Sequence, residues 1–128
     1  MLKTFKGGIH PPYNKKTTKQ KPIQKATLPK KVIMPMGMHI GAPCEPTVSV
    51  GDLVKKGQPV GEAKAFVSTP VHASISGKVI AVEPRPYSGG GMMMSVVIES
   101  DGKDEVYEGV TSPKPLNELT PDEIKNLI

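Results

Sequence analysis

Two consecutive stretches decide the fold of this chain: VSVGDLVKKGQPVGEA at residues 48–63 and TPVHASISGKVIAVE at residues 69–83. Short runs of strand-forming residues are separated here by turn residues such as the Gly–Asp pair at 51–52. Gly57 and Gly77 can adopt a positive φ where a strand reverses. We therefore predict two layers of hairpins in this part of the chain.

The composition also favours short strands over long helices. The 128 residues include 13 glycines and 14 prolines and no tryptophan. A chain of this length has room for a single core. We predict one mainly β domain at residues 32–108, with five strands at residues 32–36, 47–50, 52–54, 78–82 and 95–99.

The methionines are predicted to pack in the core. Met34, Met36 and Met38 alternate, so an extended strand would point all three toward the inward face. The run 92–94 after three glycines is interpreted in the same way, with residues 89–91 as a flexible hairpin loop. A thioether copper site is the alternative, but no nearby cysteine or histidine pattern completes it.

The pattern of residues 48–83 resembles the biotinyl/lipoyl carrier domain, a flattened β barrel-sandwich hybrid. In that family the modified lysine precedes the alanine of the last strand by seven residues, and Ala73 would place it at Phe66. Lys64 is two positions away, so we expect it not to occupy the exposed tip of the hairpin. A carrier domain with biotin or lipoate attached covalently to Lys64 stays open as an alternative.

Charge is distributed unevenly along the chain. Residues 1–44 hold nine lysines and no acidic residue, which gives +9, while the rest sums to −4 and the whole chain to +5. Residues 1–31 also contain several prolines, which remove backbone donors. We predict an extended arm without regular structure at residues 1–31. Its lysines are the candidate docking residues: Lys3, Lys6, Lys15, Lys16, Lys19, Lys21, Lys25, Lys30 and Lys31.

A basic arm of this kind suits an acidic partner protein or an anionic membrane surface. The alternative is a solvated leader with no binding role. Nucleic acid is the weaker candidate, because a basic arm normally acts beside a recognition helix or stacking aromatic residues, and the sequence shows neither.

The cysteine, histidine and serine residues of this chain do not form the sequence patterns of a catalytic or metal-binding site. Its single cysteine, Cys44, excludes an internal disulfide and an iron–sulfur cluster held by four of its own thiolates. The three histidines lack the spacings of a metal site, and no serine has a nucleophile signature. We expect no catalytic, metal-binding or cofactor-binding residue. Without a long apolar stretch or a secretory signal, the fragment is expected to be soluble.

Three stretches resemble the start of the RnfC subunits of Rnf-type electron-transport complexes: TFKGGIHPPYNK (4–15), HIGAPCEPTVSVGD (39–52) and TPVHASISGKV (69–79). The resemblance implies a peripheral protein on the cytoplasmic face of the cell membrane. Its later domains would bind FMN and NADH and hold two 4Fe–4S clusters. The complex would couple electron flow between ferredoxin and NAD to ion pumping. Other domains of the RnfC subunit and neighbouring Rnf subunits would be the partners, and Cys44 would have a packing role.

Residues 109–128 are predicted to be a linker and the start of a helix. Thr120 and Glu123 have the spacing of a capping box, with Pro121 at the first helical position. Barely two turns would follow before Ile128, so we expect a truncated helix and a longer natural polypeptide. Two main functions stay open, a docking module of an oxidoreductase complex and a carrier domain, with a basic-arm binder of membrane or nucleic acid as the third.

Overall fold

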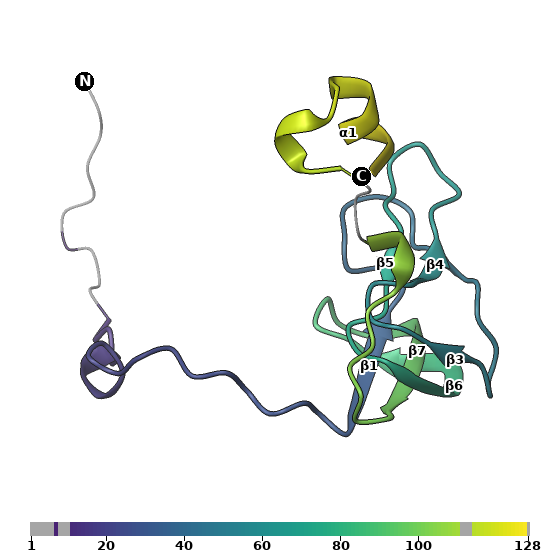
Figure 1. Ribbon diagram of the computed structural model, residues 1–128. Coiled ribbons are helices and arrows are strands. Elements are labelled where there is room, and N and C mark those ends of the chain that lie inside the picture. Colours follow the sequence, from purple (N-terminus) through teal and green to yellow (C-terminus); the bar gives the residue numbers. More distant parts are fainter. Residues whose placement is uncertain (1–6, 8–10, 111–113, 128) are drawn as a thin grey trace.

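The computed structural model describes Gly7, residues 11–110 and residues 114–127. These residues form a mainly β domain with a long arm, as predicted (Figure 1). In chain order the elements are η1 (Lys15–Thr17), β1 (Lys31–Pro35), β2 (Glu45–Pro46), β3 (Leu53–Val54), β4 (Pro59–Glu62), β5 (Val71–His72), β6 (Gly77–Pro86), β7 (Met92–Ser100), η2 (Glu108–Val110), η3 (Leu116–Glu118) and α1 (Pro121–Leu127).

The strands form two antiparallel sheets. One has the order β1-β7-β6-β3 and the other β2-β4-β5. The long hairpin β6–β7 supplies the two central strands of the first sheet. It pairs Gly77 with Ser100 at one end and Pro86 with Met92 at the other. The glycines at 89–91 form its turn, as predicted, with Gly90 and Gly91 at positive φ. The arm enters β1 at one end of the domain (Figure 1).

Both sheets contribute to one core. Val79, Val96 and Ile98 from the β6–β7 hairpin are completely buried, as are Val60 from β4 and Met36 just after β1. Hydrophobic burial is the main favourable term in folding, so these residues hold the two sheets together. The rest of the buried cluster is Cys44, Val54, Val71, Ala73 and Ile75.

The prediction of a strand at residues 47–50 was wrong. The backbone turns there, because the Asp52 carboxylate accepts the backbone N–H of Ser49 at 2.8 Å and the Asp52 N–H returns to the Ser49 carbonyl at 3.2 Å. A side chain that bonds nearby backbone in this way competes with a strand ladder. Val50 is consequently 63% exposed.

Strands β2, β4 and β5 were not predicted. β2 and β5 have two residues each, and β4 contains Pro59 and Gly61, which are poor strand formers. Gly61 is required by packing, since a Cβ there would lie 2.7 Å from the Met36 sulfur. This close approach is invisible in the local sequence pattern.

The methionine predictions were partly right. Met34 and Met36 do face the core, but Met38 lies beyond the end of β1 and is 58% exposed. Met92 and Met94 also lie largely in solvent, because the end of the β6–β7 hairpin that carries them extends past the core.

Both ends of the described chain contain short helical segments, of which only the C-terminal one was predicted. In the arm, a single turn of 3-10 helix at Lys15–Thr17 interrupts a segment predicted to have no regular structure. At the other end, the capping box is confirmed: Thr120 Oγ1 accepts the Glu123 N–H at 3.3 Å, and Glu123 Oε2 accepts the Thr120 N–H at 2.8 Å. The domain limits 1–31, 32–108 and 109–128 stay predictions.

Candidate docking surfaces

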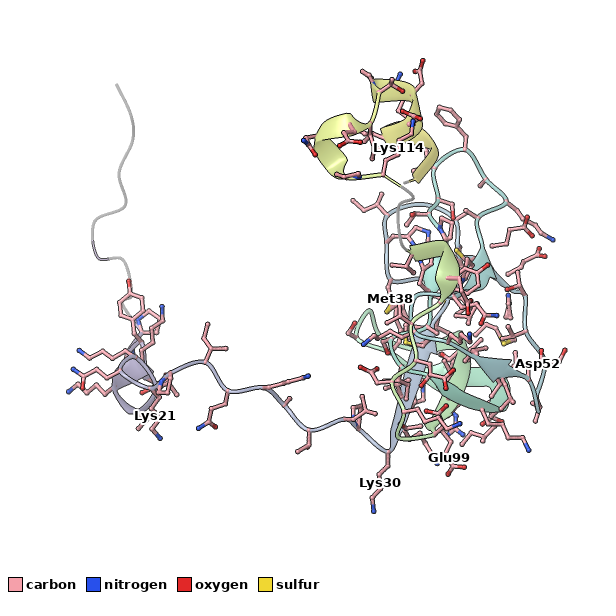
Figure 2. All side chains as sticks on the ribbon, in the orientation of Figure 1. Lys21, Lys30, Met38, Asp52, Glu99 and Lys114 are labelled. Atoms are coloured by element: carbon pink, nitrogen blue, oxygen red, sulfur yellow. The ribbon has the colours of Figure 1, made fainter. Side chains whose placement is uncertain are left out.

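The arm holds the predicted docking lysines away from the domain. All residues from 11 to 31 in the arm are exposed, and Figure 2 shows their side chains projecting from an extended chain. Lys15 and Lys16 lie in the turn η1, and the Lys19 N–H bonds to the Lys15 carbonyl at 2.9 Å. Lys21 and Lys30 follow along the chain toward the domain (Figure 2), with Lys25 between them in sequence. Lys3 and Lys6 lie outside the described residues.

The charges of the arm are not neutralised by the domain. Among the described residues, no arm lysine forms an ion pair with a carboxylate. Lys15 lies 5.4 Å from the centre of the Tyr13 ring, a cation–π contact within the arm itself. Lys31 begins β1 and stands opposite Glu99 of β7. The arm is therefore a cluster of cations open to an external anionic group.

A second exposed surface is formed by two loops, residues 37–43 and 63–70, which we call the tip. The loops are joined by a hydrogen bond from the Ala42 N–H to the Val67 carbonyl at 3.0 Å. Gly41 makes this contact possible: its φ is +108°, and a Cβ there would lie 2.0 Å from the Val67 carbonyl oxygen. The tip is thus a fixed arrangement of two loops.

Polar side chains inside the tip reinforce it. Ser68 Oγ donates to the Ala42 carbonyl at 2.9 Å, and His39 Nε2 lies 3.0 Å from the same hydroxyl and 3.1 Å from the same carbonyl. These contacts connect side chains of both loops with the Ala42 carbonyl. Cys44 is buried and its thiol donates to the Thr69 carbonyl at 2.9 Å, which confirms its packing role.

The outward side of the tip is apolar. Phe66 is fully exposed, Ile40 is 90% exposed and Val67 is 55% exposed. Phe66 lies in the loop between β4 and β5, where comparison with carrier domains placed the modified lysine. Lys64 forms an ion pair with Glu45, and this hydrogen bond raises the pKa of the ammonium group. This arrangement is consistent with the prediction that Lys64 does not occupy the exposed end of the hairpin loop between β4 and β5.

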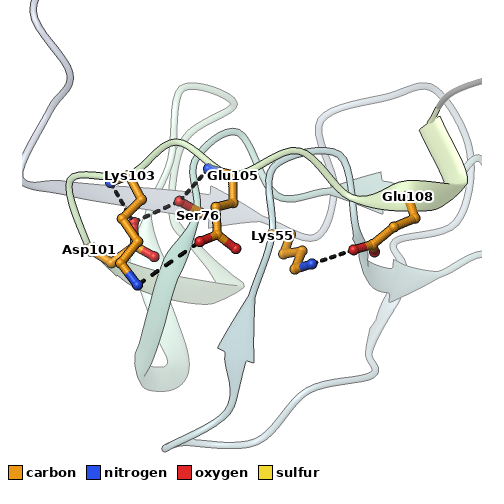
Figure 3. Close-up of polar contacts among 6 residues, drawn as sticks. All are labelled: Lys55, Ser76, Asp101, Lys103, Glu105 and Glu108. Carbon is orange, nitrogen blue, oxygen red and sulfur yellow. Dashed lines mark hydrogen bonds and ion pairs between the residues drawn. The ribbon is translucent and has the colours of Figure 1, made fainter.

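Residues 101–108, which we call the strap, follow β7 and are hydrogen-bonded to the rest of the domain at several points. Ser76, which is 1% exposed, donates to Asp101 Oδ1 at 2.7 Å and accepts the Glu105 N–H at 3.0 Å (Figure 3). Lys56 accepts from the Tyr107 N–H and donates its own N–H to Glu105, each at 2.8 Å. The Ser76 bonds span 25 and 29 residues and the Lys56 bonds about fifty, so the local pattern of the sequence did not predict them.

Between the strap and the strands lies a cleft of about 280 Å³ lined by charged residues. Lys55 pairs with Glu108, and Lys103 approaches Glu105 at 4.0 Å (Figure 3). The hydrogen bond from Lys55 lowers the pKa of Glu108, and the Ser76 hydroxyl together with the Lys103 N–H lowers the pKa of Asp101. The charged groups are used in holding the strap, which argues against a ligand site there.

Two kinds of function find no support in the described residues. No group of three or more histidine, cysteine or acidic side chains is placed to hold a metal ion in residues 11–110 and 114–127. Within the same ranges, no helix has the length and apolar character needed to cross a membrane.

Comparison with known proteins finds one family and relatives that are all named as C subunits of ion-translocating oxidoreductase complexes. Residues 3–103 match the family described as the RnfC barrel sandwich hybrid domain. The chain is 54% identical over 125 residues (98% of its length) to the C subunit of the Na⁺-translocating ferredoxin:NAD⁺ oxidoreductase complex of Acetobacterium woodii. It is 47% identical over 128 residues (100%) to the proton-translocating counterpart of Clostridium ljungdahlii. The C subunit of the ion-translocating oxidoreductase complex of Pseudomonas aeruginosa is 43% identical over 109 residues (84%). The chain spans 28%, 28% and 14% of these relatives.

Proposed function

The chain belongs to the family of RnfC barrel sandwich hybrid domains, and from this premise we propose that it is the N-terminal docking domain of a peripheral RnfC subunit. The parent would be an ion-translocating ferredoxin:NAD oxidoreductase at the cytoplasmic face of the cell membrane. The names of the relatives from Acetobacterium woodii and Clostridium ljungdahlii support this parent. Since the chain spans 28% of each, the redox activity is assigned to the longer protein.

The redox groups of such a parent would be held elsewhere. A 4Fe–4S cluster requires four thiolates, and this chain has one cysteine, whose thiol is buried and bonded to a carbonyl. The residues present therefore do not fit a cluster held by this domain alone. The two clusters, FMN and the NAD(H) site are proposed to belong to other domains of the RnfC subunit.

The observation that carries the docking role is the unpaired charge of the arm. Seven described lysines from Lys15 to Lys31 are exposed and without an ionic partner among the described carboxylates. We propose that they contact an anionic surface, either the acidic face of a neighbouring subunit or an anionic leaflet. Each lysine near an anionic leaflet contributes about 1 kcal/mol.

The test is binding of the full chain to vesicles with and without anionic phospholipid, and to an acidic neighbouring subunit. Replacing Lys15, Lys16, Lys19 and Lys21 by glutamine should weaken binding by up to about a thousandfold. The same four positions changed to arginine keep the charge and should keep the affinity. Binding should be lost as the Debye length falls from about 10 Å at 0.1 M salt to about 3 Å at 1 M. If the glutamine and arginine variants bind alike, the arm is not a docking element.

The alternative of a carrier domain has a separate test. Biotin or lipoate on Lys64 would add a fixed increment to the intact mass of protein expressed with the attaching enzyme. We expect the unmodified mass, because Lys64 is paired with Glu45 at the base of the loop. A modified mass that disappears in a Lys64→Arg variant would replace the docking function with a carrier function.

A further inference from the structure

We propose that the apolar side of the tip docks against an apolar surface of the domain that follows this one in a longer RnfC subunit. This inference rests on the proposed function, because it takes the chain to be one part of such a protein. It concerns a different surface from the arm: Ile40, Phe66 and Val67 carry no charge, and they lie on loops outside residues 1–31.

The first argument is the preorganisation of the tip. Exposed loops usually carry polar residues, whereas these two loops present a fully exposed phenylalanine, Phe66, and an isoleucine, Ile40, that is 90% exposed. The loops are nevertheless held together by backbone and side-chain hydrogen bonds, from Ala42 to Val67 and from Ser68 to Ala42. A rigid apolar projection loses little conformational freedom on binding, and aromatic residues on such projections are common binding hot spots.

The second argument concerns which occupant fits. Lys64 at the edge of the tip stands between Glu45, with which it pairs, and Glu62, so the charged groups here sum to −1. An anionic leaflet would be repelled by this edge, whereas the lysines that would suit one lie on the arm. The charges around the tip therefore favour an apolar protein surface with a neutral or basic edge.

The third argument identifies that protein surface. The curated relatives from Acetobacterium woodii and Clostridium ljungdahlii are much longer, since the chain spans 28% of each. Helix α1, the last described element, lies at the same end of the domain as the loop between β4 and β5, and the arm enters at the opposite end (Figure 1). A polypeptide that continues from α1 thus starts at the end of the domain that carries the β4–β5 loop. The following domain is the occupant that needs the shortest connection.

The test measures how accessible the tip is in a full-length protein. A full-length chimera is made in which the chain replaces the matched part of the Acetobacterium woodii relative. A Phe66→Cys variant of the chimera and of the isolated chain is treated with a thiol reagent. The extent of labelling is quantified on the peptide that contains residue 66. We expect labelling at least about tenfold slower in the full-length chimera than in the isolated chain. A Val50→Cys variant, on the 49–52 turn and 63% exposed, is the matched control and should label at similar rates in both.

Further controls separate the outcomes. The buried Cys44 reports folding of the domain, since it should stay unreactive in every sample. The same two cysteines placed at the aligned positions of the Acetobacterium woodii protein repeat the measurement without a chimera. Equal labelling of residue 66 in isolated and full-length forms would overturn the proposal. Protection of the isolated chain by vesicles, or by raising its own concentration, would also overturn it, assigning the tip to a membrane or to a second copy.

Failure of this proposal and failure of the arm proposal give different results. Protection of the tip should be unchanged at 1 M salt and after changing the arm lysines to glutamine, because apolar contacts are not screened. Binding through the arm should disappear under both conditions. A protected tip together with a non-binding arm would therefore refute the arm alone.

Discussion

The strap and the tip are both irregular segments that lie outside the two sheets, but they satisfy their side chains in different ways. The strap bonds its polar groups to the domain, through Ser76 and through the Lys55–Glu108 ion pair. The tip bonds its backbone internally and leaves Phe66 and Ile40 in water. The comparison indicates that the strap contributes to the stability of the domain, while the apolar side chains of the tip contribute little to it and are available for the contact that we propose.

The largest effect on stability is expected at Gly77, which pairs with Ser100 just before the strap begins. In a Gly77→Ala variant the Cβ would lie 1.9 Å from the Glu99 carbonyl oxygen, which belongs to backbone and cannot move aside easily. We expect a loss of about 4 kcal/mol in the free energy of unfolding, measured in urea. Gly51→Ala is the control, since Gly51 also has positive φ but nothing lies within 4 Å of its Cβ. It should cost about 1 kcal/mol, and equal losses for both variants would contradict the role of the contact.

The next effect concerns the buried hydroxyl that holds the strap. Ser76→Ala removes a donor to Asp101 and leaves the Glu105 N–H without its acceptor. An unsatisfied buried group costs about 1–3 kcal/mol, so we expect a loss of that size in the free energy of unfolding. Ser74→Ala makes the same change at an exposed position two residues earlier and should stay within about 0.5 kcal/mol of the parent. A neutral Ser76→Ala variant would show that the strap is not held through this hydroxyl.

A smaller effect is expected from acid. The folded-state pKa of Asp101 is lowered first by the Ser76 hydroxyl and then by the Lys103 N–H, and that of Glu108 is lowered by Lys55. A lowered folded-state pKa contributes stability above the unfolded-state pKa, and this contribution is lost as the pH falls through the folded value. Thermal midpoints should therefore decline below about pH 5. The decline should be shallower in Asp101→Asn, and a parallel decline in that variant would exclude Asp101 as a source.

The smallest effect on stability is expected at the tip. Phe66→Ser and Ile40→Ser change side chains that are already in water, so the free energy of unfolding should stay within about 0.5 kcal/mol of the parent. Chemical denaturation of each variant measures this directly. A substantial destabilisation by either change would mean that the tip packs on its own domain, and the contrast with the strap would disappear.

Local patterns predicted the parts of the fold that local patterns control. The capping box at Thr120 and Glu123 and the turn at residues 89–91 each depend on neighbouring residues, and both were found. Alternation placed Met36 correctly but not Met38, because the pairing with β7 continues only as far as the bond from the Met36 N–H to the Met94 carbonyl. Residues 47–50 have the residue pattern of a strand, but the Asp52 carboxylate accepts the Ser49 N–H and stabilises a turn instead.

The remaining features depend on distant contacts. Strand β4 tolerates Gly61 because Met36 fills the space above it, and the strap is held by Ser76 and Lys56, each many residues away. The candidate arm could be predicted from charge alone, since its exposure requires no partner. The tip could be predicted only in part: comparison with carrier domains pointed to Phe66, while the loop that carries Ile40 joins the Phe66 loop through the bond between Ala42 and Val67.

The positions of the arm and the β4–β5 loop at opposite ends of the domain have a consequence for assembly (Figure 1). Ligands at two ends of a small rigid body do not compete for space, and capture at one end raises the effective concentration at the other. With the two proposed contacts in place, the domain would act as a bivalent tether, in which two weak attachments give one long-lived connection. Release at either end would then shorten the lifetime of the whole.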